Sequence, residues 1–453
     1  SRSRRLILAA LLYVIAAGVF AAVAGPQRLT EHTQYNHYAL LADAWLHGRW
    51  DLPTGPPAYA MNNDFVSFEG KTYISFPALP AMLMLPFVKL SGNPENFRDG
   101  QFVIWLAALS PAFLFLALEK LRRTGRSQRT EVQNSLLSLL FAFGTVYFFT
   151  AVEGFVWFAA LVVAAAASAL YVLFALDAER PVLAGAMIGC LYLSRPTAIW
   201  IALLFALEGL RVSIDGELPT DGTWRVRLRS VLERLKWRDL ARRYLLFSVP
   251  ILCAFAFVAW ANYVRYHRAS PIYFDHEYLT VAWRARMEKW GMFNYHFFAK
   301  NLGVAFTSLP WLPAKGERAM FGTPFKVNEH GLAVWFTTPI YIWLLWPKRF
   351  DGDPKRKWLY VVAALAAALP AMMDLLYQNT GWRQFGYRFS NDYAVLLFVL
   401  LAVGARPMKK LFWAAAVWGV AWNLFGAMTF DRGGMAQRWY FSDGSQTIVY
   451  QPD

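Results

Sequence analysis

The stretch LILAALLYVIAAGVFAAVA, residues 6–24, is continuously apolar and close to the length of about 20 residues that a helix needs to cross hydrocarbon. Ten further apolar runs follow it. They cover residues 102–118, 135–150, 155–176, 182–193, 197–207, 244–261, 332–346, 359–376, 394–403 and 411–430. Backbone polar groups cannot go unpaired in lipid, so these runs are expected to be helices. The sequence therefore predicts an all-α polytopic membrane protein with about eleven transmembrane helices.

The composition supports a membrane protein and argues against a nucleic-acid partner. Of the 453 residues, 57% are hydrophobic and only 17% are charged, whereas a soluble protein carries about a quarter charged residues. The net charge of +15 comes mostly from basic residues beside the apolar runs, where they fix orientation and contact anionic lipid. We therefore expect membrane lipids, and no nucleic acid, as partners. Cys190 and Cys253 lie inside apolar runs, so no disulfide framework is predicted.

Basic residues in short linkers predict the orientation, because Lys and Arg are enriched on the cytoplasmic side. The candidate cytoplasmic segments are the N-terminus and residues 120–129, 211–243, 348–357 and 406–410. This assignment predicts a multi-pass protein of the plasma (inner) membrane with a cytoplasmic N-terminus and an extracytoplasmic C-terminus. The basic start and first apolar run also fit a cleaved signal peptide, but the many later runs favour a signal anchor.

We expect one transmembrane domain over residues 1–453, without internal repeats. Its hydrophilic parts are an external loop, a cytoplasmic linker, a long external loop and an external tail, at about residues 25–101, 211–243, 265–330 and 431–453. In the linker, Leu228, Val231, Leu232 and Leu235 recur at helical spacing among arginines. This pattern predicts an amphipathic helix on the inner leaflet, and a solvated linker helix is the alternative.

The apolar sequence of residues 182–207 is interrupted by Ser194-Arg195-Pro196-Thr197. Proline disfavours helix at the residue before it, so Arg195 is a natural break. One unbroken helix would instead place this arginine at mid-bilayer, at a cost of about 2.5–3.5 kcal/mol. We therefore predict two short spans joined by an external turn.

All seven histidines lie in two hydrophilic stretches, residues 28–99 and 265–330, that the charge pattern places outside. A polytopic protein that keeps its titratable side chains on that face is expected to do its chemistry there.

The first external loop has the pattern of elements that lie along a membrane surface. Tyr38 and Trp45 share one face of a short predicted helix, and Gly48 is a suitable stop. Beyond it, the pattern predicts a turn at residues 68–73 and a second amphipathic stretch from residue 76 to about 90.

Residues 30–90 and the break at Arg195 resemble the GT-C superfamily of polytopic glycosyltransferases. The shared features are an acid after the first span, a juxtamembrane helix ending in Gly-x-Trp, a proline-rich turn and a second juxtamembrane stretch. Protein O-mannosyltransferases and lipid A aminoarabinose transferases are members, and they take sugar from a polyprenyl-phosphate carrier. The usual Asp-Glu pair at the loop entrance appears here as Thr30-Glu31, which leaves the identity of the base open.

The resemblance implies inverting transfer of a sugar from a polyprenyl-phosphate-linked donor to an extracytoplasmic glycan, lipid or protein acceptor in envelope biogenesis. An acceptor hydroxyl needs a carboxylate to take its proton. Glu31 is the first candidate by its place at the loop entrance, and Asp64 and Asp43 are the alternatives. Each acid could equally be solvated or structural, and Asp43 could simply pair with His47, four residues on.

The leaving lipid phosphate needs a cation at the membrane–water boundary. The resemblance points to Arg195, at the tip of the predicted hairpin. A later aromatic segment supplies Arg383, Tyr387 and Arg388, of which Arg388 lies nearest a span and is the second phosphate candidate. The alternative is an aromatic belt with a structural ion pair between Arg388 and Asp392.

Two further polar groups are candidates for substrate binding. Glu153 lies in a tight external turn, where the resemblance implies contact with substrate or metal and a plain turn residue is the alternative. His276 lies between Asp275 and Glu277 in the long loop and could serve acceptor recognition. Zinc-type His spacing does not occur in the sequence, so no protein metal ligands are assigned, while a requirement for Mg or Mn stays open.

Two other functions fit a polytopic protein with these loops. A transporter or flippase for a lipid-linked or anionic substrate is one, although such proteins usually contain internal repeats. A polysaccharide polymerase or ligase is the other, and it would use a lipid pyrophosphate donor.

Overall fold

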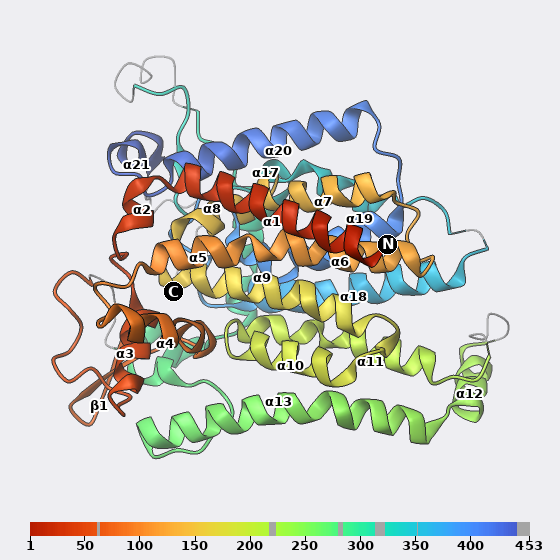
Figure 1. The fold of residues 1–453 in the computed structure, drawn as a ribbon, viewed down its shortest axis with the longest axis horizontal. Helices are drawn as coiled ribbons and strands as arrows, with labels where there is room; N and C mark the ends of the chain where they lie inside the picture. Colours follow the sequence, from red (N-terminus) through yellow and green to blue (C-terminus); the bar gives the residue numbers. More distant parts are fainter. Residues whose placement is uncertain (61–63, 217–222, 280–283, 313–321, 351, 442–453) are drawn as a thin grey trace.

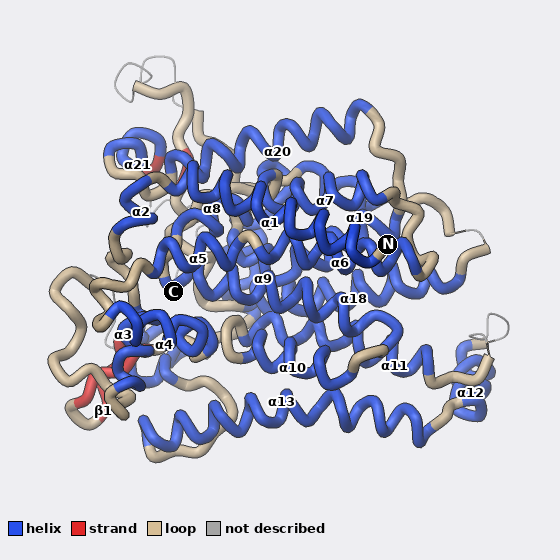
Figure 2. The backbone as a smooth tube through the Cα atoms, in the orientation of Figure 1, coloured by secondary structure: helices blue, strands red, loops and turns tan. Residues whose placement is uncertain are grey.

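The computed structural model describes residues 1–60, 64–216, 223–279, 284–312, 322–350 and 352–441. It is a bundle of helices that run between two ends of the molecule (Figures 1 and 2). One end carries α2, α3, α4 and a β-hairpin and is called the loop end below. The other end carries the N-terminus and α12 and is called the N-terminal end.

In the described chain, six helical segments are long and apolar enough to cross a membrane. They are α1 (Arg2–Ala24), α5 with α6 (Asp99–Ala107, Leu109–Arg123), α9 with η1 (Val156–Ala175, Leu176–Ala178), α13 (Trp237–Tyr266), α18 (Pro354–Leu376) and α20 (Lys410–Thr429). A seventh is obtained if α7 (Glu131–Phe143) and α8 (Tyr147–Glu153), bent by 58°, form one span. A helical multi-pass membrane architecture therefore stands, but the expected count of about eleven is not confirmed.

The remaining apolar runs form shorter elements. They are α10 (Pro181–Tyr192), η2 (Pro196–Ala202), α11 (Leu203–Val212), α17 (Val334–Thr337), η5 (Pro339–Leu345) and α19 (Asn391–Gly404). Pro339 lies inside the run of residues 332–346, and the helix of α17 ends before it. The predicted break at Arg195 is present, since α10 ends at Tyr192 and the next helical turn begins at Pro196.

Burial separates a central helix from helices at the periphery. In the most apolar stretch of α9, 78% of the residues are buried inside the protein, whereas the corresponding shares are 28% in α1 and 22% in α13. α10 packs closely on α13 through Gly185 and Gly189. A Cβ at Gly185 would clash with the Phe247 carbonyl oxygen, and one at Gly189 would lie 3.2 Å from that of Pro250. Small residues four apart let two membrane helices approach in this way.

The loop end is built from short elements at the ends of the long helices (Figure 1). They are α2 (Pro26–Thr30), α3 (His37–Leu46), β1 (Phe65–Phe68), β2 (Lys71–Ile74), α4 (Leu79–Ser91), η3 (Asp275–Tyr278), α14 (Arg284–Trp290), η4 (Tyr295–Phe297), α15 (Phe298–Phe306), β3 (Val327–Asn328), η6 (Arg388–Ser390), α21 (Gly434–Trp439) and β4 (Tyr440–Phe441). The predicted surface helix is α3, and the second amphipathic stretch contains α4. β3 pairs in parallel with β4, so the long loop is tied to the C-terminal segment. Residues 442–453 of the expected external tail lie outside the described residues.

At the N-terminal end, buried cations pair with carboxylates. Arg126 is paired with Asp177 and, at 2.7 Å, with Glu208, and Lys120 lies 2.5 Å from Glu179. The predicted amphipathic helix of the linker is α12 (Trp224–Arg234). Its neighbouring Leu235 packs with residues of α11 and α13.

Candidate active site

Asp64 is held at the base of the hairpin at the loop end. Phe65 pairs with Ile74, and both turn residues, Glu69 and Gly70, have positive φ, as a tight two-residue hairpin turn requires. The hairpin brings Ser75 back beside Asp64, whose carbonyl oxygen accepts hydrogen bonds from the Ser75 backbone N–H at 3.3 Å and hydroxyl at 3.0 Å. Local turn chemistry therefore fixes the position of this carboxylate.

The Asp64 side chain is turned inward and meets α9. The indole Nε1 of Trp157 donates to its Oδ2 at 2.8 Å. Burial raises the pKa of Asp64 to about 6, although the Trp157 hydrogen bond and the positive charge of Arg388 oppose the rise. A carboxyl group that titrates near neutral pH can accept a proton from a substrate.

Arg388 is a buried cation without a carboxylate partner among the described residues. Its side chain lies over the rings of Phe158 and Phe389, at 5.1 and 5.6 Å from their centres. Nη1 donates to the Arg383 carbonyl oxygen at 3.2 Å, and Nε has no hydrogen-bond partner in the described part of the chain. Burial, together with the nearby charge of Arg195, lowers the pKa of Arg388 to about 9. An anion placed here would satisfy a charge that is costly to leave buried and unpaired.

Arg195 also lies over the ring of Phe389, at 5.0 Å from its centre, and is already paired. Its Nε donates to both carboxylate oxygens of Asp392, at 3.0 and 3.1 Å, and Nη2 also contacts this carboxylate. Thr197 donates a further hydrogen bond to Asp392 at 3.0 Å, and Asp374 lies 3.9 Å from Arg195. The Asp392 carboxylate is thus bound by Arg195, and the local pair with Arg388 considered from the sequence does not form. A phosphate role for Arg195 stays a prediction, and a phosphate would have to compete with Asp374 and Asp392 for its guanidinium.

Gln384 holds Arg388 in place and was not singled out from the sequence. It is fully buried, its amide Nε2 donates to the carbonyl oxygens of His330 and Thr380 at 2.7 Å each, and its Oε1 accepts from the Arg388 backbone N–H at 2.8 Å. A Cβ at Gly381 would lie 2.5 Å from the Gln384 side chain, so the glycine makes room for it. The available signal was an amide within an otherwise aromatic and basic segment.

Glu153 is engaged by Arg28, another residue that sequence analysis did not select. Glu153 is fully buried, and Arg28 contacts its two oxygens at 2.6 and 3.2 Å. Arg383 is also paired, with Glu329 at 2.8 Å and Asp431 at 3.6 Å. These pairs join the first loop, the long loop and the C-terminal segment, so both predicted residues have structural partners.

The other predicted residues lie in different surroundings. Asp43 is 3.6 Å from His47 on α3, the pair considered from the sequence. Tyr387 is buried beside Phe389, and its hydroxyl has no hydrogen-bond partner among the described residues. His276 is half-buried in η3, and burial lowers its pKa. Its neighbour Asp275 is bound by Arg265 at 2.6 Å, which ties η3 to the end of α13.

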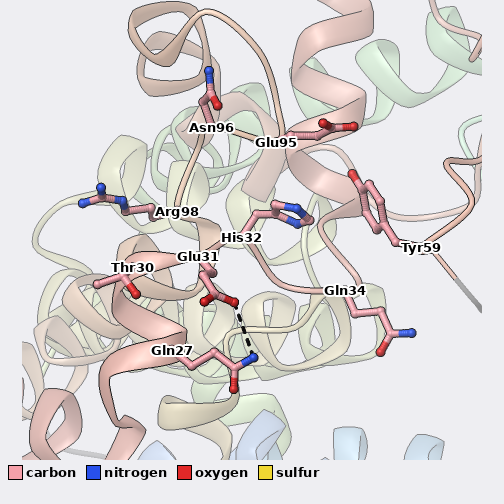
Figure 3. Close-up of a pocket in the computed structure, with 9 residues that line it drawn as sticks. All are labelled: Gln27, Thr30, Glu31, His32, Gln34, Tyr59, Glu95, Asn96 and Arg98. Carbon is pink, nitrogen blue, oxygen red and sulfur yellow. Dashed lines mark hydrogen bonds between the residues drawn. The ribbon is translucent and has the colours of Figure 1, made fainter.

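Glu31 lies at the end of α2 and lines a polar cavity of about 570 Å³ (Figure 3). The side chain is exposed, and the Gln27 amide donates to it at 3.4 Å. The residues that line this cavity include neither Asp64 nor Arg388. Among the described residues, no group of three or more His, Cys, Asp and Glu is placed to hold a metal ion, so none of the candidate acids is assigned as a metal ligand.

No protein-family model and no curated protein matches this chain. It is similar to the Archaeoglobus fulgidus oligosaccharyltransferase in two crystal structures. The apo form shares 14% identity at a TM-score of 0.43, over 96% of this chain and 56% of that enzyme. The form tethered with an acceptor peptide containing the NVT sequon shares 16% identity at a TM-score of 0.42, over 95% and 55%. The chain thus spans little more than half of that enzyme's length, and a likeness this remote identifies neither a substrate nor a site residue.

Proposed function

We propose that the protein is a GT-C-like glycosyltransferase that moves a sugar from a polyprenyl-phosphate carrier to an acceptor on the outer side of the plasma (inner) membrane. The observation that carries the proposal is Arg388, a buried cation without an ion-pair partner among the described residues, at the same end of the molecule as the half-buried carboxylate of Asp64, whose pKa its positive charge lowers. The first group suits an anionic leaving group and the second suits proton removal.

The reaction assigned to these groups is a single displacement. The acceptor hydroxyl oxygen bonds to the anomeric carbon while the bond from that carbon to the phosphate oxygen breaks. The bonding electrons leave with the polyprenyl phosphate, whose charge Arg388 stabilises, and the hydroxyl proton passes to Asp64 and then to water. Asp64 is preferred as the base over Glu31 and Asp43 because its pKa is raised to about 6, whereas Glu31 is exposed and Asp43 lies beside His47. A single displacement inverts the anomeric carbon.

An apolar surface that could take a lipid-linked donor continues from the aromatic ring beneath Arg388. α15 buries Val304 and Ala305 against Tyr387 and Phe389, the aromatic ring that lies under Arg388. Past this contact, the side chains of Phe306, Leu309 and Leu312 are exposed. An isoprenoid chain would cover such side chains while its phosphate reaches the guanidinium.

The test is transfer by the purified protein in detergent, with a panel of polyprenyl-monophosphate sugars and envelope acceptors. The expected result is labelled product together with stoichiometric release of polyprenyl phosphate. Asp64→Asn is expected to lower turnover about 100-fold or more, since general base catalysis contributes at least this much. Glu288→Gln, an exposed carboxylate on α14 at the same end, is the matched control. Full activity of Asp64→Asn would overturn the assignment of the base.

One observation favours the alternative, a transporter or flippase. Asp374, Asp392 and Arg195 form a buried charged cluster at the ends of α18 and α19, and buried charges in membrane helices are typical of transport pathways. Movement of the donor across liposomes without covalent change would support it. Consumption of a pyrophosphate-linked donor alone would instead identify a polymerase or ligase.

A further inference from the structure

We infer that the cavity beside Glu31 is the acceptor site and that it takes an uncharged saccharide, so that the acceptor is a glycan. This inference rests on the proposed glycosyl transfer. It selects among the three acceptor classes, glycan, lipid and protein, that the sequence leaves open.

The cavity has the size and place of a site for a small ligand. Its volume of about 570 Å³ lies within the range of about 300–1,000 Å³ typical of small-molecule sites. It opens at the loop end, where residues after α2 face the segment that leads into α5 (Figure 3). This is the end of the molecule that also carries Asp64 and Arg388.

The side chains around the cavity suit sugar hydroxyls. Three of them are carboxamides, those of Gln27, Gln34 and Asn96. A carboxamide offers both donors and acceptors, as a hydroxyl does, and can engage two neighbouring hydroxyls at once. Thr30 adds a hydroxyl group to the same lining. A polyol therefore finds a partner for most of its groups.

An aromatic wall completes the cavity. The rings of His32 and Tyr59 lie 4.8 Å apart at an angle of 47°. The Tyr59 hydroxyl donates to Asn36 at 3.3 Å, which fixes the orientation of the ring. Fixed aromatic side chains pack well on the apolar faces of sugar rings.

The charge and polarity of the lining disfavour the other acceptor classes. Glu31 and Glu95 outnumber the single cation Arg98, so a phosphorylated acceptor would be repelled. No aliphatic side chain belongs to the lining among the described residues, so a lipid tail or an apolar peptide would meet mainly polar side chains. A neutral glycan carries no negative charge and has polar groups for these side chains to bind.

One short segment connects the cavity to the proposed base. Gln34 lines the cavity, and the ring of the next residue, Tyr35, lies 4.8 Å from that of Trp157, which donates to Asp64. Thr33 is anchored to Asp99 through its backbone N–H at 2.7 Å and its hydroxyl at 2.6 Å. A glycan in the cavity thus contacts the segment that packs against the Asp64 partner.

The test compares acceptor fractions and variants in nanodiscs. Neutral oligosaccharides, phosphorylated oligosaccharides, lipids and peptides prepared from the envelope are offered separately with the same donor. The neutral oligosaccharides are expected to be glycosylated. Gln34→Ala and Tyr59→Ala are expected to raise the acceptor KM about tenfold with the donor KM unchanged, whereas Gln437→Ala, an exposed glutamine on α21, leaves both unchanged.

Two results would overturn the inference. One is glycosylation of only lipid or peptide fractions, and the other is an unchanged acceptor KM in both cavity variants. Donor hydrolysis by water in the absence of acceptor separates the two proposals. If it persists while the cavity variants have no effect, the transferase stands and the glycan site fails. If no donor is consumed under any condition, the proposed function itself has failed.

Discussion

The two ends of the molecule treat a buried arginine differently. At the N-terminal end, Arg126 is almost fully buried and meets two carboxylates, Asp177 and Glu208. Arg129 at the same end donates to the carbonyl oxygens of Leu401 and Arg406, around the C-terminus of α19, where helix carbonyls carry negative partial charge. Arg126 is therefore neutralised by two carboxylates, while Arg129 has two carbonyl partners for its Nη2 and none for its Nε among the described residues.

At the loop end, Arg388 is buried to a similar degree but receives one carbonyl oxygen and two aromatic faces. Aromatic faces attract a cation by only about 0.5–2 kcal/mol, less than a buried carboxylate. We infer that the ion pairs of Arg126 at the N-terminal end stabilise the fold, whereas Arg388 at the loop end is available to bind an anionic ligand.

The largest effect is expected from Arg388→Ala. Removing the cation that the proposed reaction assigns to the leaving phosphate should lower donor kcat/KM about 100-fold, which corresponds to roughly 2.7 kcal/mol of transition-state stabilisation. Arg388→Lys should recover part of this loss, since it keeps the charge but not the planar fork. Steady-state kinetics with Arg284→Ala, an exposed arginine on α14, as the control would measure it. Equal losses of kcat/KM in Arg388→Ala and Arg284→Ala would contradict the assignment of Arg388 to the leaving phosphate.

The pH dependence of transfer should follow Asp64. Its pKa is raised to about 6, so the base is protonated and inactive at lower pH and becomes active as pH rises through that value. We expect kcat/KM to fall about tenfold per pH unit below 6 and to level off above it. Trp157→Phe removes the hydrogen bond that stabilises the carboxylate, so the inflection should move to higher pH. An inflection that stays in place in this variant would contradict the assignment.

A smaller loss is expected from Gln384→Ala, because this residue acts through Arg388. The donor KM should rise about tenfold with the acceptor KM unchanged. In the Arg388→Ala background the same substitution should add little, since residues that act as a unit are not additive. Full additivity in this double-mutant cycle would show that Gln384 has only a general structural role.

The smallest effect on transfer is expected from Arg126→Met, at the opposite end. It leaves Glu208 buried with fewer partners, so the free energy of unfolding should fall by about 3–5 kcal/mol. Thermal unfolding in detergent would measure this loss, and activity per folded molecule should stay unchanged. A loss of transfer activity without a loss of stability would contradict the purely structural role of Arg126.

The local features of the fold could be predicted from the sequence. α3, α4 and the break at Arg195 follow from periodicity and from the effect of proline on the preceding residue, both of which act over a few residues. The number of spans expected from hydropathy is not confirmed, because runs such as residues 332–346 are apolar yet fold into short helical elements.

The partners within the site were beyond sequence reasoning for a different reason. Asp392 lies four residues after Arg388, which suggested a local pair, but its partner Arg195 is 197 positions away. Likewise, Arg28 and Glu153 are 125 positions apart. Such contacts are set by helix packing, which a single sequence does not reveal.

The most direct test of the account is equilibrium binding of polyprenyl phosphate and of the neutral polyprenol to the protein in nanodiscs. The two ligands differ only in the phosphate that Arg388 is assigned to bind. We predict that the wild-type protein prefers the phosphate at least tenfold and that Arg388→Ala abolishes this preference. Equal affinity of the wild-type protein for both ligands, or an undiminished preference in the variant, would contradict the central claim.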